Sequence, residues 1–91
     1  MYVLVLDSLS LAHKACQGGH AVAQYLLNNP ETAWNNGNMI YLDASEEQLR
    51  DCAAKHDTVP FWEEDFDNQL TAIACITTNR KRFAKHKLVG G

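Results

Sequence analysis

Residues 2–27 read YVLVLDSLSLAHKACQGGHAVAQYLL, and they contain the two kinds of segment from which the fold is built. The apolar run Tyr2–Leu6 has the length and composition of a strand that is buried on both faces. Ser10 is a favourable N-cap for a helix, and apolar residues then recur every three or four positions up to about Leu27. The predicted core-facing residues of this helix are Leu11, Ala15, Gly19, Val22 and Leu26.

The rest of the chain continues the alternation of strands and helices. Further strands are predicted at residues 39–42, 59–62 and 70–76. A second helix begins at the capping box Ser45-Glu46-Glu47-Gln48. Pro60 cannot donate a hydrogen bond to a neighbouring strand, so its strand must lie at an edge or contain a bulge.

The connections between the predicted strands determine their directions. Strands joined by a helix run parallel, whereas the last two strands are joined by a loop too short for a crossover and must be antiparallel. We therefore expect an α/β fold, a three-layer α/β/α sandwich around a four-stranded mixed sheet. Thr77 or Thr78 can cap a final basic helix that includes Phe83.

Length and composition restrict the class of protein. The chain has 91 residues, of which 46% are hydrophobic, so residues 1–91 are expected to form one domain with one core. No apolar run reaches the roughly 20 residues of a membrane span, and the beginning, with Asp7 in its middle, does not resemble a secretory signal. The three cysteines indicate reduced thiols in an intracellular, cytoplasmic protein. They are Cys16, Cys52 and Cys75.

Charge is distributed unevenly along the chain. Residues 1–79 contain three basic and eleven acidic residues, whereas residues 80–91 contain five basic residues and no acidic one. A basic segment attached to an acidic body suggests a contact with nucleic acid or another phosphate, although it can also be a solvated terminus. The five basic residues are Arg80, Lys81, Arg82, Lys85 and Lys87.

Two segments contain residues that could take part in chemistry. Gln17-Gly18-Gly19-His20 places two glycines inside a helix, where each costs about 1 kcal/mol relative to alanine. Gly19 can serve tight packing on the sheet, and either glycine can allow the close approach of a ligand. The acidic loop 63–69 lies between two apolar strands, and a carboxylate there can orient or deprotonate a water molecule. His13, Cys16 and His20 do not complete a tetrahedral metal site, so no metal is expected.

The chain resembles the type-two peptidyl-tRNA hydrolases, in particular their short branch found in phages and bacteria. The resemblance rests on the opening YVLV strand, on Gln17-Gly18-Gly19-His20-Ala21 in the first helix, and on EDFDNQLTAIA at residues 64–74. It covers residues 2 to about 76. It implies hydrolysis of the ester between a peptide and the 3′-terminal ribose of tRNA, without a metal or another cofactor, and it implies the same three-layer sandwich.

The resemblance also suggests a role for individual residues. Asp65 matches the family's aspartate and would orient or deprotonate water, and Thr71 matches its threonine and would hydrogen-bond substrate or water. The family's lysine position, four residues before Gln17, is occupied by His13, and Lys14 is one residue out of register. Either of these two would stabilise the oxyanion or the leaving ribose oxygen.

Binding roles follow for other residues. Gln17 and His20 would shape the site, unless His20 is a core histidine bonded to backbone. The segment that contains Arg80, Lys81, Arg82 and Lys85 would hold tRNA phosphates. A catalytically inactive family member that binds nucleic acid, nucleotide or a host protein is the alternative, favoured by the acidic body and the displaced lysine. The sequence leaves the oligomeric state open between a monomer and a homodimer, and no membrane partner is expected.

Overall fold

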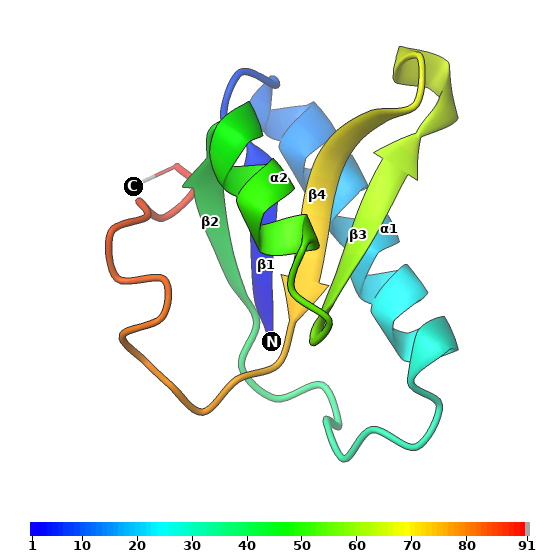
Figure 1. Ribbon diagram of the computed structural model, residues 1–91, viewed down its shortest axis with the longest axis vertical. Coiled ribbons are helices and arrows are strands. Elements are labelled where there is room, and N and C mark those ends of the chain that lie inside the picture. The colour runs from blue at the N-terminus through cyan, green and yellow to red at the C-terminus, as the bar shows by residue number, and fades with distance from the viewer. Residues whose placement is uncertain (91) are drawn as a thin grey trace.

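The computed structural model describes residues 1–90, and its elements follow one another in the predicted order up to the fourth strand (Figure 1). The elements are β1 (Tyr2–Leu6), α1 (Leu11–Asn28), β2 (Ile40–Ala44), α2 (Glu46–Ala53), β3 (Thr58–Glu63), the 3₁₀ turn η1 (Glu64–Phe66) and β4 (Gln69–Cys75). Both predicted helix caps are present. The Ser10 side chain accepts from the backbone N–H of His13, and Ser45 and Gln48 form the reciprocal capping box.

The four strands form one mixed sheet in the order β2-β1-β4-β3. β1 and β2 are parallel, and β4 is antiparallel to both β1 and β3. The predicted mixed sheet and the antiparallel last pair are therefore confirmed. Pro60 lies opposite Ile73 on the edge strand β3, as expected for a residue that cannot donate to a neighbour on both sides.

The two helices lie on opposite faces of the sheet, as Figure 1 shows. Alternate residues of β1 point to opposite faces. Val3 and Val5 pack in one cluster with Ala21 and Val22 of α1. Leu4 and Leu6 pack in the other cluster, which contains Leu49 and Cys52 of α2. These two clusters explain why β1 and β4 are apolar on both faces.

The buried face of α1 differs from the predicted one. Leu11 is 65% exposed, Leu26 is 37% exposed, and Ala15 and Gly19 are also exposed, so only Val22 of the predicted stripe is buried. The buried residues of α1 are instead Gln17, Gly18, Ala21 and Val22. The face of α1 that packs on the sheet is thus displaced by about one residue from the predicted apolar face. The physical reason is that Thr71 and Glu63 of the sheet hydrogen-bond the side chain of Gln17. In addition, the ring of Tyr41 leaves no room for a side chain at position 18.

Gly18, rather than Gly19, is the glycine required by packing. A Cβ atom at position 18 would lie 2.3 Å from Cε2 of Tyr41, on β2, whereas one at position 19 would meet nothing within 4 Å. The aromatic ring of Tyr41 therefore rests directly on the backbone of α1, which brings α1 close to the parallel pair β1 and β2. The cost of a glycine inside a helix is offset at position 18 by this close approach.

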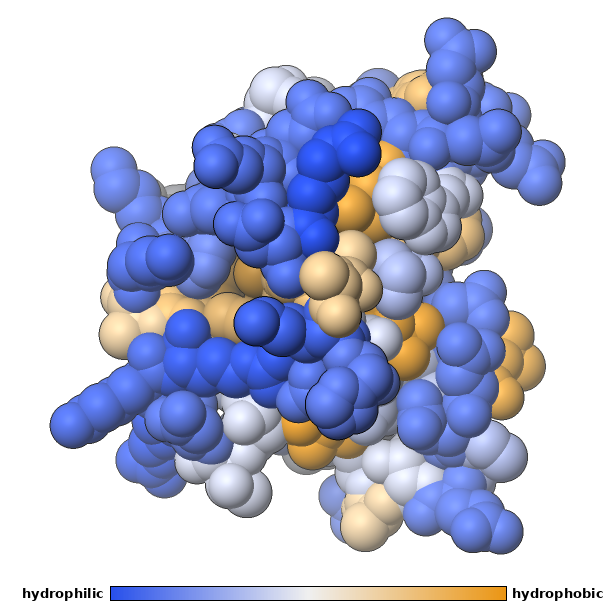
Figure 2. All heavy atoms as spheres, in the orientation of Figure 1, coloured by the Kyte–Doolittle hydropathy of each residue, from blue (hydrophilic) through white to orange (hydrophobic). Residues whose placement is uncertain are grey.

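The predicted basic C-terminal helix is absent. Residues 80–85 form successive turns instead, and Thr77 caps a short turn by accepting from the backbone N–H of Asn79. Phe83 is buried against the α2 side of the sheet, and Leu88 pairs with Leu42 as an isolated antiparallel bridge. The segment after β4 therefore runs over the α2 face and covers the free edge of β2. Figure 2 shows that hydrophilic residues dominate this face, with hydrophobic atoms visible only in separate patches.

Candidate functional site

The two segments that carry the family resemblance meet at one end of the sheet. β1, β2 and β3 run in the same direction, so their carboxyl ends lie together, and β4 starts there. α1 also begins at this end, and the η1 turn lies beside it, at the top of Figure 1. Carboxyl ends of parallel strands are the usual position for ligand sites in open α/β sheets.

A chain of two hydrogen bonds joins α1 to both β4 and β3. The Thr71 hydroxyl donates to Oε1 of Gln17 at 2.6 Å, and Nε2 of Gln17 donates to Oε1 of Glu63 at 2.9 Å. The amide nitrogen of Gln17, which donates, thus faces Glu63, and its amide oxygen, which accepts, faces Thr71. Thr71 has no exposed surface and Gln17 is 2% exposed. This pair is therefore an internal connection, and Glu63 is its half-buried end.

Lys14 is held against β2 by an ion pair. Its Nζ lies 2.8 Å from Oδ1 of Asp43, and the two side chains are 13% and 26% exposed. Within residues 1–90 no donor is aligned well enough to form a hydrogen bond with this Oδ1, so the contact is one between charges. The backbone of Asp43 is also fixed, because its N–H donates to the carbonyl oxygen of Lys87 at 2.8 Å. The pair joins α1 to β2 near the carboxyl end of that strand.

His13 and His20 are exposed, and each contacts one aromatic ring. His13 meets Phe66 of η1 edge-on at a centroid distance of 5.8 Å. His20 stacks on Phe61 of β3 at 4.8 Å, with an interplanar angle of 14°. His20 is therefore not the backbone-bonded core histidine considered as an alternative. Both imidazoles lie on the side of α1 that faces β3 and η1.

Asp65 is the middle residue of η1 and is exposed to solvent. The chain then turns through Asp67 and Asn68, whose φ angles are 53° and 58°. Aspartate and asparagine tolerate this left-handed conformation better than most residues, which explains the turn at this position. The turn leads into β4, which begins at Gln69, only two residues before Thr71. The sequence places Asp65 on the loop, and the structure places that loop beside the start of α1.

Of the basic residues after β4, Arg80 and Arg82 lie apart from this corner of the molecule. Arg82 forms a two-pronged ion pair with Asp57, in which Nη2 lies 2.9 Å from Oδ1. This hydrogen bond lowers the pKa of the Asp57 carboxyl and raises that of Arg82. Arg80, Lys81 and Lys85 are exposed, and none has an ion pair among the residues described. Of the four residues predicted to hold tRNA phosphates, Arg82 is therefore already engaged in an ion pair within the protein.

The cysteines do not form a reactive or metal-binding group. Cys16 is exposed, whereas Cys52 and Cys75 are buried. Burial raises the pKa of Cys75 to about 11 and also raises that of Cys52, so neither is readily ionised. In the described part of the chain, no three His, Cys, Asp or Glu side chains come together as a metal site would require.

Sequence reasoning missed two partners in this site. Glu63 was grouped with the acidic loop, yet it is the last residue of β3 and points toward Gln17. The period of two in Val59, Phe61 and Glu63 could have indicated this, because it puts Glu63 on the same side as Phe61. Asp43, the partner of Lys14, could have been noticed as the one charged residue of β2.

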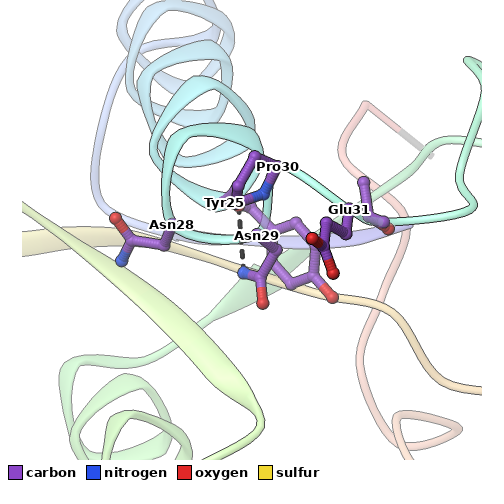
Figure 3. Close-up of a pocket in the computed structure, with 6 residues that line it drawn as sticks. Tyr25, Asn28, Asn29, Pro30 and Glu31 are labelled. Atoms are coloured by element: carbon purple, nitrogen blue, oxygen red, sulfur yellow. Dashed lines mark hydrogen bonds between the residues drawn. The ribbon is translucent and has the colours of Figure 1, made fainter.

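A separate hollow of about 410 Å³ lies at the opposite end of α1 (Figure 3). Tyr25, Asn28 and Glu31 are among its lining residues, and the Asn29 side chain donates to the carbonyl oxygen of Tyr25 at 3.0 Å. The same carbonyl oxygen also accepts from the Asn29 backbone N–H at 2.9 Å, so Asn29 caps the end of the helix with both groups. None of the predicted site residues lines this hollow, and helix capping is sufficient to explain its polar lining.

Models of protein families, curated proteins and solved structures were compared with the chain, and no match was found in any of the three. No helix within residues 1–90 has both the length and the apolar character needed to cross a membrane.

Proposed function

We propose that the protein hydrolyses the ester bond of peptidyl-tRNA, or of N-blocked aminoacyl-tRNA, in the cytoplasm. The observation that carries this proposal is the hydrogen-bonded connection from Thr71 through Gln17 to Glu63. It joins the two segments on which the family resemblance rests, although they are about fifty positions apart in the sequence. The contact between His13 and Phe66 supports the same convergence, because it brings the start of α1 against the η1 turn.

The exposure of the side chains suggests how the roles are divided. Asp65 and His13 are exposed at this corner and can reach a bound ester and its attacking water. Thr71 is fully buried, so we assign it to positioning Gln17 rather than to contact with substrate. Lys14 is largely buried in its pair with Asp43, which makes His13 the better candidate for stabilising the oxyanion.

The proposed reaction needs only water as a co-reactant. Asp65 accepts a proton from a water molecule, whose oxygen attacks the ester carbonyl carbon and forms a tetrahedral oxyanion. His13 stabilises that oxyanion, as a preorganised hydrogen-bond donor does in other acyl-transfer sites. The bond from the carbonyl carbon to the ribose 3′ oxygen then breaks, and this oxygen receives the proton from Asp65. The products are a free tRNA and the carboxylic acid of the peptide, which releases its remaining proton to solvent and becomes a carboxylate.

For tRNA binding, the exposed cations after β4 provide the phosphate contacts. Lys85 and Lys87 flank His86, whose Nδ1 lies 3.0 Å from the carbonyl oxygen of Asp43. The basic segment therefore passes beside the carboxyl end of β2, next to the Lys14–Asp43 pair. A tRNA acceptor end at the candidate site could thus contact Lys85 and Lys87.

The test is release of peptide from N-acetylated aminoacyl-tRNA by the purified chain. Asp65→Asn should lower the hydrolysis rate about 100-fold or more, which is typical for loss of a positioned acid–base group. Asp51→Asn, which changes an exposed carboxylate on α2, is the matched control and should leave the rate unchanged. Full activity in a folded Asp65→Asn protein would remove Asp65 from the mechanism.

A binding module without catalysis is the second candidate. Two observations favour it, namely the full burial of Thr71 and the pairing of Lys14 with Asp43, because each keeps a matched or neighbouring family residue from contact with a substrate. Such a protein would bind tRNA or another nucleic acid and leave the ester intact. Binding of N-acetylated aminoacyl-tRNA without peptide release, by a protein that is fully folded, would support this alternative.

A further inference from the structure

The end of the sheet opposite the candidate site contains the largest of the hollows described, with a volume of about 580 Å³. This volume falls within the roughly 300–1,000 Å³ typical of small-molecule sites. The hollow lies between the loop that precedes β2 and the segment that follows β4. Its lining combines the aromatic residues Tyr2 and Trp34 with the hydroxyls of Thr77 and Thr78 and the guanidinium of Arg80.

Trp34 is held in place before any ligand arrives. Its indole Nε1 donates to the carbonyl oxygen of Asn38 at 3.2 Å, and its backbone N–H donates to the Thr32 hydroxyl at 3.3 Å. The polar edge of the indole is therefore already satisfied, and the ring is half-buried against the α1 side of the sheet. A fixed ring with its donor occupied offers a ligand its aromatic face, on which a planar base can stack.

Arg80 lies within two overlapping turns. The Thr77 hydroxyl oxygen accepts from the Asn79 backbone N–H, and the Asn79 side chain accepts from the Lys81 backbone N–H at 3.1 Å. These turns fix the backbone on both sides of Arg80. Because the Thr77 oxygen acts as an acceptor, its hydroxyl proton stays available to donate to a ligand.

The charge of the hollow selects an anion. Arg80 is the one charged side chain among its lining residues, and no acidic residue is part of that lining. No carboxylate forms an ion pair with Arg80 within residues 1–90. A planar guanidinium can bind two oxygens of one phosphate or carboxylate group at once.

We propose that this hollow binds one nucleotide unit, with its base against Trp34 and its phosphate on Arg80 and the threonine hydroxyls. The unit can be a free mononucleotide or one nucleotide of single-stranded RNA, since both present the same base and phosphate. The inference does not depend on ester hydrolysis, because the hollow and the Gln17–Glu63 corner lie at opposite ends of the sheet.

The two tryptophans of the chain allow a direct test. Trp62 lies on the edge strand β3 and is 47% exposed, so Trp62→Phe is expected to fold and leaves Trp34 as the single reporter. Adding AMP or CMP to this variant should quench the Trp34 fluorescence in a saturable manner. Adenosine and inorganic phosphate, each of which lacks half of the ligand, should bind at least about tenfold more weakly, as expected when one charged hydrogen bond or one stacked base is lost.

Two substitutions of exposed cations provide the matched comparison. In the Trp62→Phe background, Arg80→Gln should weaken AMP binding about tenfold, the effect of losing one charge-assisted hydrogen bond. Lys55→Gln removes the same charge from an exposed residue outside the lining and should change the affinity less than twofold. No saturable quenching, or equal effects of the two substitutions, would overturn the proposal.

An eight-nucleotide single-stranded RNA distinguishes the two sources of the nucleotide. RNA binding that is much tighter than AMP binding, and that is weakened by Arg80→Gln, supports the proposal with RNA as the ligand. Equal affinities for AMP and RNA support it with a free nucleotide as the ligand. Inorganic phosphate that binds as tightly as AMP would overturn it, because the base would then contribute nothing.

Discussion

Replacing Thr71 by valine removes one hydroxyl from the centre of the molecule and leaves its shape nearly unchanged. In the native protein this hydroxyl donates to Oε1 of Gln17 at 2.6 Å, and both residues are almost completely buried. In Thr71→Val, the Gln17 oxygen keeps its burial and loses its donor. The variant therefore measures the cost of a buried acceptor without a partner, rather than the net value of one hydrogen bond.

The expected loss of stability is about 1–3 kcal/mol, the penalty for burying an unpaired neutral polar group. For a domain of roughly 60–100 residues each kcal/mol corresponds to about 4–8 °C in Tm, so Tm should fall by about 5–20 °C. Urea unfolding followed by circular dichroism measures the change in free energy directly. Thr78→Val is the control, because Thr78 is exposed and its substitution should stay within about 0.5 kcal/mol.

The double variant Thr71→Val with Gln17→Leu completes the test. It removes both buried partners together and leaves only Glu63, which is half-buried and can be solvated. The stability loss of the double variant should be smaller than the sum of the two single losses by about 1 kcal/mol or more. An unchanged stability in Thr71→Val, or exact additivity in the double variant, would refute the role of this hydrogen bond in joining α1 to β4.

Two further predictions concern other parts of the fold. Gly18→Ala should destabilise the protein, because the new Cβ would lie 2.3 Å from the Tyr41 ring. Gly19→Ala should stabilise it by up to about 1 kcal/mol, because a Cβ there meets nothing within 4 Å and alanine favours the helix. Thermal unfolding compares the two variants, and equal effects would contradict the packing described. The Asp57–Arg82 pair lowers the pKa of Asp57, so its stabilisation is present above the unfolded pKa of about 3.9 and is lost as the pH falls through the lower folded value. Asp57→Asn should therefore reduce stability at pH 7 and have a smaller effect at pH 2. Urea unfolding at both pH values tests this, and equal effects would contradict it.

The candidate site could be predicted in part, because its two sequence segments were each visible. Gln17 and Thr71 were both singled out in the sequence, and a hydrogen bond joins them in the structure. The partners of the site residues were not predictable in the same way. Asp43 pairs with Lys14 only because the parallel strands β1 and β2 place their carboxyl ends beside α1.

By itself, the sequence determined the local features of this protein. The strand Tyr2–Leu6, the Ser10 cap, the Ser45 capping box and the edge position of Pro60 all depend on neighbouring residues or on the chemistry of a single residue. The antiparallel last pair of strands followed from the length of one loop. These features were predicted correctly because their causes lie within a few positions of each other.

The tertiary structure alone decided which side of α1 faces the sheet and what becomes of the segment after β4. The apolar stripe would bury Leu11 and Leu26, but the sheet offers the Tyr41 ring, which admits only Gly18, and the Thr71 hydroxyl, which satisfies Gln17. Similarly, Phe83 enters the core from a series of turns, and Arg82 beside it is held by Asp57, which precedes β3. Such contacts join residues 23 to 54 positions apart, and no local pattern encodes them.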